Sequence, residues 1–180
     1  MKNRYHLISG SVLIILIFYI FPIFTIAQIP TARLIDNRKN SFASPTNLSA
    51  LEQRVYELIN QTRAENGLKK LFWDEEVARV ARLHSTNMAN FNFFSHVGID
   101  GKRVDGRADS MGLSNWHLIG ENIAYNAGFE NPVDRAIYGW MNSPGHRENI
   151  LRENWKETGI GIAVSREGRY YITQVFLKRK

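Results

Sequence analysis

The chain has 180 residues, of which 44% are apolar and 22% are charged, and it contains no cysteine. This composition supports the packed core of one ordinary domain and is unlike that of a disordered chain. The lack of cysteine excludes disulfide bonds, thiolate nucleophiles and cysteine-based zinc sites. The formal net charge of +6 comes from scattered basic residues. Because these are not concentrated among aromatic residues, we expect no nucleic-acid partner.

Residues 1–27 combine a basic start with a long apolar run. Lys2 and Arg4 come first, and Thr25 and Ala27 are small residues near the end of the run. This pattern predicts a secretory signal peptide at 1–27, with an uncleaved N-terminal membrane anchor as the alternative. Either segment would export the rest of the chain to the extracellular space or the cell envelope. We expect contact with a membrane only through this segment.

Residues 28–47 mix proline, serine, asparagine and charge without any period, which predicts a linker. The stretch "SALEQRVYELINQTRAENG" then predicts a helix, because its apolar residues follow one helical stripe and Gly67 is placed to end it. Ser49 and Glu52 have the spacing of a capping box at its start. We expect the following "LKKLFW" to be a short extended link.

A second helix is predicted for "DEEVARVARLHSTNMANF", with Asp74 as its N-cap. Val77, Ala81, His84 and Met88 fall on one face at helical spacing. His84 therefore lies on an apolar stripe, which favours a hydrogen-bonded core histidine over a ligand.

The second half of the chain predicts two helices followed by two strands. Residues 91–119 are rich in glycine and aspartate and predict a long loop with a short helix. "NPVDRAIYGWMN" predicts a helix with Asn131 as cap, and "SPGHRENILREN" predicts a restarted helix with Ser143 as cap. "GIGIAVS" and "RYYITQVFL" predict strands of a hairpin that turns at Gly168. Helices before strands indicate an α+β fold with an antiparallel sheet.

Three motifs could carry chemistry: "FFSH" ending at His96, "GENIAY" with Glu121, and "SPGHRENI" with His146. They are about 25 residues apart, so their spacing does not bring them together. No metalloprotease motif, nucleophile elbow or phosphate loop is present. His146 occupies the third position of the restarted helix, where the positive end of the helix dipole favours neutral imidazole. That form suits a ligand as well as a hydrogen bond to a neighbouring carbonyl group.

Five ordered motifs resemble the bacterial branch of the CAP superfamily, also called SCP-like domains. They are "HSTNMANFNFFSH", "GENIAY", "WMNSPGHRENIL", "GIGIA" and "YYITQVF", within residues 48–178. The resemblance implies a three-layer α-β-α sandwich, with a small antiparallel sheet between helical layers and a shallow open cleft.

In eukaryotic members of this superfamily, two histidines and two acidic residues line the cleft and can hold a divalent metal such as zinc. By resemblance, His96 matches the first histidine and Glu121 the first acidic residue. Ser143 stands where the second acidic residue occurs, and Tyr171 where the second histidine occurs. If His146 reaches the cleft, a zinc ion could find three ligands and one open position at His96, Glu121 and His146. Otherwise Glu121 would accept bonds from His96 and backbone amides in a polar network.

Two classes of function remain, and we favour a non-enzymatic binding module. Its cleft, or a groove near "FNFF", "NWHL" and "IAY", would bind a small apolar ligand, a peptide or a component of the cell envelope. The resemblance adds lipid, because relatives are reported to bind sterols and fatty acids. Core packing is nevertheless the expected role of most of Phe91, Phe93, Phe94 and Trp116.

The alternative is a metal-assisted or serine-type hydrolase acting from the same cleft. In that hypothesis Glu121 or His96 activates a water molecule or the hydroxyl of Ser95 or Ser143. A third interpretation, a structural envelope protein tethered by residues 1–27, differs mainly in the role of that segment.

Overall fold

The computed structural model describes residues 45–180. The predicted signal peptide or anchor at 1–27 and most of the predicted linker at 28–47 lie outside the described residues. Within 45–180, no helix is both long enough and apolar enough to span a bilayer.

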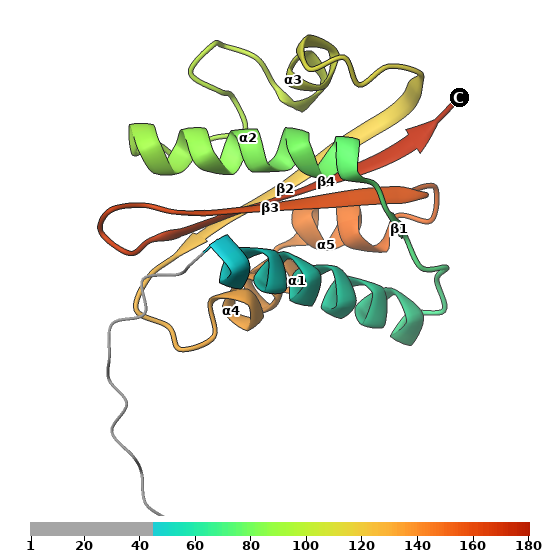
Figure 1. The fold of residues 1–180 in the computed structure, drawn as a ribbon. Coiled ribbons are helices and arrows are strands. Elements are labelled where there is room, and N and C mark those ends of the chain that lie inside the picture. Colours follow the sequence, from blue (N-terminus) through green and yellow to red (C-terminus); the bar gives the residue numbers. More distant parts are fainter. Residues whose placement is uncertain (1–44) are drawn as a thin grey trace, which may run out of the picture. The chain divides into compact units, whose positions relative to one another are not determined.

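Five helices and four strands make up the described part of the chain (Figure 1). In chain order they are α1 (Pro45–Glu65), β1 (Phe72–Trp73), α2 (Glu75–Phe91), α3 (Val104–Ser110), β2 (Trp116–Asn126), α4 (Pro132–Met141), α5 (Pro144–Leu151), β3 (Glu157–Val164) and β4 (Tyr170–Arg179).

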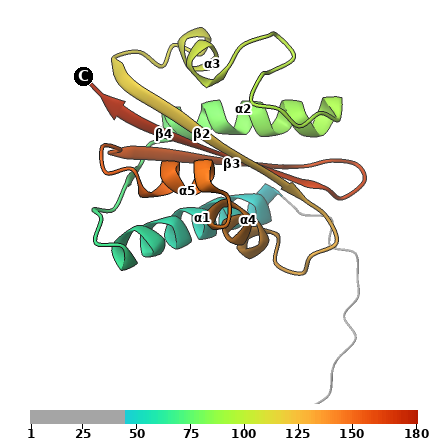
Figure 2. The ribbon, with the colours of Figure 1, turned by 180° about the vertical axis from the view of Figure 1, so that it is seen from behind.

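The four strands form one sheet in the order β1-β3-β4-β2, between two helical layers. Helices α2 and α3 lie on one face, and α1, α4 and α5 lie on the other (Figures 1 and 2). Strand β4 is central and its alternate residues enter different clusters: Ile172 and Phe176 pack with one layer, Val175 and Leu177 with the other. The predicted α+β sandwich is therefore confirmed.

The sheet is mixed rather than purely antiparallel as predicted. β3 and β2 both pair antiparallel with β4, whereas β1 pairs parallel with β3. The amide of Phe72 donates to the carbonyl of Lys156 at 2.9 Å, and that of Asp74 to the carbonyl of Thr158 at 3.0 Å. A strand of two residues is too short to show any period, so the sequence indicated only an extended link there.

Two further elements differ from prediction. The prediction of a capping box at Ser49 and Glu52 is wrong, because α1 already begins at Pro45. Glu52 is buried instead and binds Arg82 of α2. Strand β2 was not predicted at all, and its first residues fall within the expected loop at 91–119. It does not alternate between apolar and polar residues, because polar side chains in its middle are buried.

Helix α2 follows its prediction closely. The carboxylate of Asp74 accepts a hydrogen bond from the amide of Val77 at 3.0 Å, as expected of an N-cap. His84 is fully buried and its Nε2 donates to the carbonyl of Ser95 at 2.9 Å. Burial lowers the pKa of His84, so this core histidine is neutral.

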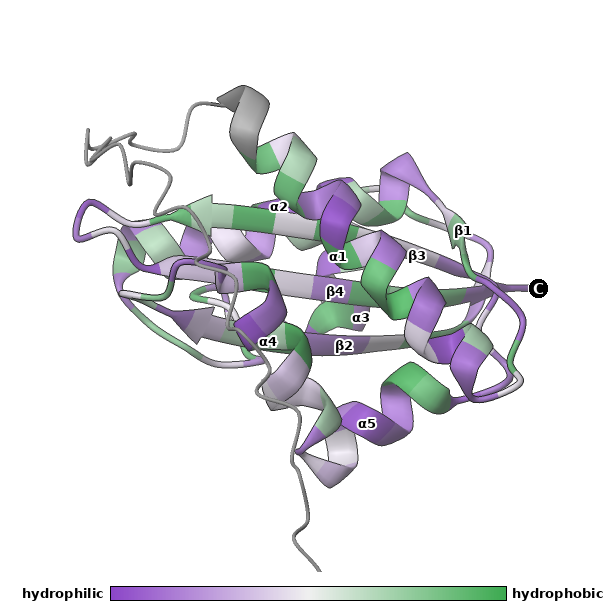
Figure 3. Cartoon of the chain, turned by 90° about the horizontal axis from the view of Figure 1, so that it is seen from below, coloured by the Kyte–Doolittle hydropathy of each residue, from purple (hydrophilic) through white to green (hydrophobic). Residues whose placement is uncertain are grey.

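The backbone of α2 lies directly against β3 at two glycines. A Cβ atom at Gly159 would lie 2.1 Å from the nitrogen of Ala78, and one at Gly161 would lie 2.1 Å from the nitrogen of Arg82. Only glycine allows this approach. On the opposite face, apolar residues of α1, α4 and α5 pack with those of β3 and β4 in one core cluster. The apolar residues of these helices are green in Figure 3.

Candidate functional site

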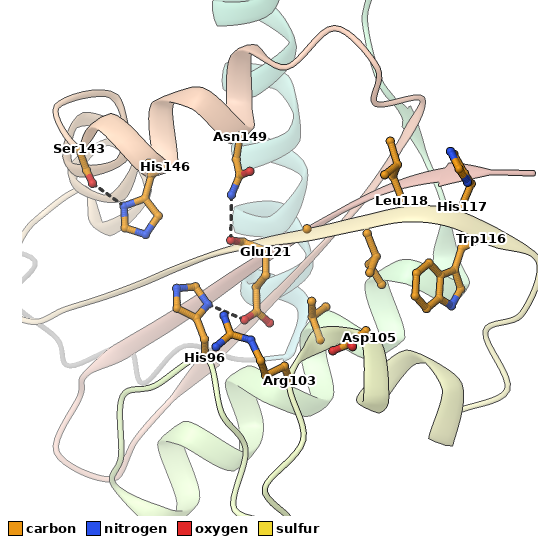
Figure 4. A pocket seen from close by; sticks show the side chains of 14 residues that line it. His96, Arg103, Asp105, Trp116, His117, Leu118, Glu121, Ser143, His146 and Asn149 are labelled. Carbon is orange, nitrogen blue, oxygen red and sulfur yellow. Dashed lines mark hydrogen bonds and ion pairs between the residues drawn. The ribbon is translucent and has the colours of Figure 1, made fainter.

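A cleft of about 640 Å³ runs along the outer side of β2, between α3 and α5 (Figure 4). Its floor consists of six consecutive strand residues, 116–121. Arg103 and Asp105 line it near the start of α3, and His146 and Asn149 line it on α5. His96, from the loop between α2 and α3, completes the lining on the α3 side.

Glu121 is the centre of a hydrogen-bonded network below the cleft. Its side chain is buried, and its Oε1 accepts a hydrogen bond from Nδ1 of His96 at 2.8 Å. Its Oε2 accepts one from Nη2 of Arg107, which is also buried. The Nη1 of Arg107 donates to the carbonyls of His96 at 3.0 Å and Lys102 at 2.9 Å. Both oxygens of the carboxylate are therefore engaged, and its charge is paired with a guanidinium group.

The fold explains why these groups meet. Side chains alternate between the two faces of a strand, so Glu121 points to the same face as Ile119 and Ile123, toward α2 and α3. Arg107 lies in the middle of α3, a helix of seven residues. Sequence reasoning missed Arg107, because so short a helix has no clear period and charged neighbours at Asp105 and Asp109 suggest a solvated surface.

Ser143 and His146 form the opposite wall of the cleft. Nδ1 of His146 and Oγ of Ser143 share a hydrogen bond of 2.9 Å. The rings of His146 and His96 lie 6.4 Å apart between centroids, with their planes tilted by 34°. Burial, and secondarily the charge of His96, lower the pKa of His146. This favours the neutral imidazole expected from the sequence, with burial as the main cause.

Asparagine side chains hold α5 against β2. Asn149 Nδ2 donates to the carbonyl of Glu121 at 3.2 Å and to Oδ1 of Asn122 at 3.0 Å. Asn122 Nδ2 in turn donates to the carbonyl of His146 at 3.1 Å. Neither asparagine was predicted as a site residue, although both belong to the quoted motifs "GENIAY" and "SPGHRENI". Their role depends on two segments meeting in space.

A buried arginine fixes the other end of α5. Arg63 is only 1% exposed and lies near the end of α1. Its Nη1 donates to the carbonyls of Ile150 at 2.7 Å and Arg152 at 2.9 Å, and its Nε donates to the carbonyl of Lys69 at 3.0 Å. Carbonyl groups at a helix C-terminus lack partners within the helix, and a cation there is favourable.

Four of the five predicted site residues meet at the cleft: His96, Glu121, Ser143 and His146. Tyr171 does not line it. Its side chain is buried in a separate cluster with Met88 and Ile123, and its ring lies 6.0 Å from that of Tyr125.

The arrangement does not fit a zinc ion. Zinc ligands lie about 2.0–2.2 Å from the metal, and the carboxylate of Glu121 already holds the guanidinium of Arg107 and the ring of His96. A cation bound there would have to displace the arginine. Among residues 45–180, no three histidine, aspartate or glutamate side chains are grouped closely enough to bind a metal. The predicted three-ligand set of His96, Glu121 and His146 is thus not assembled.

A smaller hollow of about 260 Å³ lies on the other side of His146 and Ser143, which line both spaces. Phe94 and Tyr125 form part of its wall, with ring centroids 4.8 Å apart. Core packing, expected for most of the aromatic residues near "FNFF", is wrong for Phe91 and Phe94, which are 60% and 44% exposed.

The comparisons with known proteins agree with this architecture. Residues 56–176 match the model of the CAP family, described as the cysteine-rich secretory protein family. The chain belongs to this family, although it contains no cysteine.

Several relatives are bacterial. The chain is 38% identical over 130 residues to the membrane protein YlbC of Bacillus subtilis, covering 71% of this chain and 34% of YlbC. It is 37% identical over 123 residues to YkwD of the same organism, covering 68% of this chain and 46% of YkwD. The chain thus spans less than half the length of these relatives.

Among solved structures, an extracellular SCP-domain protein from Bacillus anthracis matches with a TM-score of 0.65 and 30% identity, over 76% of this chain and 44% of that one. A cysteine-rich secretory protein from Staphylococcus aureus matches with a TM-score of 0.59 and 24% identity, over 76% and 40%. The second likeness, at lower identity, concerns the fold alone.

Proposed function

We propose that this protein is an exported binding module that holds a peptide-bearing or other polar component of the cell envelope in the cleft between α3 and α5. The observation that carries this is the pairing of Glu121 with Arg107 and His96. A carboxylate with both oxygens engaged, one of them by a guanidinium group, is poorly suited to act as a general base or a metal ligand. It is well suited to hold a cleft wall in one shape.

The lining of the cleft favours a ligand with polar groups over a purely apolar one. Three histidines, an arginine, an aspartate and an asparagine line the cleft, alongside a few apolar side chains. A mainly apolar ligand would leave these groups without hydrogen-bond partners, at a cost of about 1–3 kcal/mol for each one that it buries. Export is supported by the apolar segment at residues 1–27 and by the extracellular relative from Bacillus anthracis.

The test is binding of the full-length protein to isolated bacterial cell envelopes, measured by co-sedimentation. Arg103 lines the cleft and is exposed, so Arg103→Glu should lower the bound fraction severalfold. Arg147→Glu is the matched control, because Arg147 is also an exposed arginine and does not line the cleft. Equal loss in both variants, or in neither, would contradict binding through the cleft.

A serine-type hydrolase is the second candidate, and the hydrogen bond between Ser143 and His146 is the observation that favours it. A serine next to a neutral histidine has the first two members of a nucleophilic site. Against it, no carboxylate among the described residues hydrogen-bonds to the ring of His146 to orient it. Labelling of Ser143 by a fluorophosphonate probe, together with ester or peptide turnover that Ser143→Ala abolishes, would replace the binding module with this candidate.

A further inference from the structure

The floor of the cleft is a free strand edge. Strand β2 stands at the end of the sheet order, and among residues 45–180 it pairs only with β4, so one of its two sides has no neighbouring strand from this part of the chain. Residues 116–121 of that strand line the cleft, with α3 on one flank and α5 on the other (Figure 4). An unpaired edge presents backbone N–H and C=O groups that can pair with another extended chain.

The pairing of β4 with its neighbours shows which residues of β2 direct their backbone N–H and C=O groups away from the sheet. The backbone groups of successive strand residues point to opposite sides of the strand. The carbonyl of Leu177 in β4 accepts a bond from the amide of Lys156, on the β3 side. The backbone N–H and C=O groups of Phe176 therefore point to the β2 side, where its partner is Gly120. It follows that the residues on either side of Gly120 direct their N–H and C=O groups away from the sheet.

Side-chain contacts agree with this assignment. The carbonyl of Glu121 accepts a bond from Asn149 at 3.2 Å, and that of Ile123 accepts one from Nε1 of Trp140 at 2.9 Å. Both donors lie outside the sheet. Within residues 45–180, neither the N–H and C=O of Ile119 nor the N–H of Glu121 has a hydrogen-bond partner. Three backbone groups in a row are thus available at the floor of the cleft.

We propose that this edge binds an extended peptide as an additional strand of the sheet. The proposal rests on the proposed function, since it takes the cleft to be the binding site. Main-chain hydrogen bonds to Ile119 and Glu121 would supply affinity, and side chains pointing alternately to α3 and α5 would supply specificity. A strand rises about 3.3 Å per residue, so the floor is roughly 20 Å long and accommodates four to six peptide residues.

The hydrogen-bonding groups that line the cleft favour an acidic peptide over a basic one. Arg103 and three histidines line the cleft, and its carboxylates are those of Asp105 and Glu121. The charge of Glu121 is compensated by Arg107, which leaves Asp105 as the one lining carboxylate without an arginine partner among the described residues. Glutamate or aspartate side chains on the peptide would meet Arg103 and the N–H groups of the histidines, whereas lysine would meet only Asp105.

The probe is a hexapeptide of alternating valine and glutamate, blocked at both ends and titrated into the full-length protein. At a concentration ten times its Kd, amide hydrogen exchange at Ile119 and Glu121 should slow about tenfold. The same peptide with lysine in place of glutamate should bind more weakly. Two further analogues carry N-methyl groups on the odd or on the even residues. Only one set of residues faces β2, so one analogue should lose about tenfold in affinity and the other should keep it.

A variant tests the same edge from the protein. Ile119→Pro removes an N–H that does not bond to β4, a substitution that edge strands tolerate. Ile119→Ala is its control, since it shortens the side chain and keeps the N–H. Peptide affinity should fall about tenfold in the proline variant and remain close to that of the parent in the alanine variant. The N-methylated analogues provide the same test without altering the protein.

The outcomes separate this proposal from the proposed function. Binding that shifts the resonances of Ser143 and His146 but leaves exchange at Ile119 and Glu121 unchanged, with both N-methylated analogues equal to the parent, would overturn strand addition and keep the binding module. The absence of any peptide binding at millimolar concentration would overturn the peptide as ligand. The envelope co-sedimentation with Arg103→Glu would then decide the binding module on its own.

Discussion

The two edges of the sheet differ in how many of their outward backbone groups have hydrogen-bond partners. At the β3 edge, strand β1 pairs with Thr158, and farther along the carboxylate of Glu52 accepts a bond from the amide of Ile162 at 3.1 Å. At the β2 edge, side chains cover the carbonyls of Glu121 and Ile123 but leave the groups of Ile119 open to the cleft. The β3 edge thus has partners from β1 and α1, whereas part of the β2 edge is available for a partner.

A glutamate–arginine pair lies at each edge, and the pairs differ in exposure. Glu52 and Arg82 join α1 to α2, and Arg82 is 35% exposed. Glu121 and Arg107 join β2 to α3, and both side chains are at most 3% exposed. The hydrogen bonds that Arg82 donates to the carboxylate of Glu52 hold the pKa of Arg82 above its usual value. The pair of Glu121 and Arg107 is the more deeply buried one, so removing one of its partners should lower the free energy of unfolding more.

The largest effect on stability is expected where β3 packs against α2. A methyl group at Gly161 would overlap the backbone of α2, so Gly161→Ala should destabilise the fold by more than about 3 kcal/mol or prevent folding. Gly145→Ala is the control, since a Cβ there meets nothing within 4 Å. Urea unfolding followed by circular dichroism measures both. Two variants of equal stability would contradict the close approach of α2 and β3.

The next effect belongs to the pair below the cleft. Arg107→Met leaves Glu121 buried without its cation and should lower the free energy of unfolding by about 3–5 kcal/mol. Adding Glu121→Leu to this variant should recover much of the loss, because no buried charge is then left unpaired. Urea unfolding of the two single variants and the double variant gives the coupling. Additive losses would show that the two side chains do not act as a pair.

A smaller loss is expected at the other edge. Glu52→Gln keeps an acceptor for the amide of Ile162 but removes the charge that faces Arg82. Because Arg82 is partly solvated, the expected loss is about 1.5–3 kcal/mol, below that of Arg107→Met. The exposed substitution Glu57→Gln should change the stability little. A loss at Glu52 that exceeds the one at Arg107 would reverse the ranking of the two pairs.

The smallest effect is the dependence of stability on pH. Burial lowers the pKa of both His84 and His146 below the unfolded value of about 6.5. The unfolded chain therefore takes up protons first, so stability is complete above about pH 6.5 and falls as the pH drops below it. The unfolding midpoint in urea should decrease between pH 7.5 and 5. His84→Gln should flatten this slope, whereas the exposed His117→Gln should leave it unchanged.

Elements fixed by local chemistry were predictable, and those fixed by distant contacts were not. The cap at Asp74 and the hairpin at Gly168 follow from neighbouring residues, and both are confirmed. Strand β2 was missed because its centre carries Glu121 and Asn122, which are buried only through partners on other elements. The family resemblance pointed to His96, Glu121 and Ser143, and His146 was added as a hypothesis, but nothing near Arg107 in the sequence indicates that it binds Glu121. Such pairs become visible only once the chain is folded.

The anchoring of α5 has a consequence for the thermodynamics of binding. Arg63 ties its C-terminal end to α1, and Asn149 ties its middle to β2. A wall held at two points loses little conformational freedom when a ligand arrives. Association would then be limited mainly by the ordering of the ligand itself, so an extended chain that is already stiff should bind more tightly than a flexible one of the same composition.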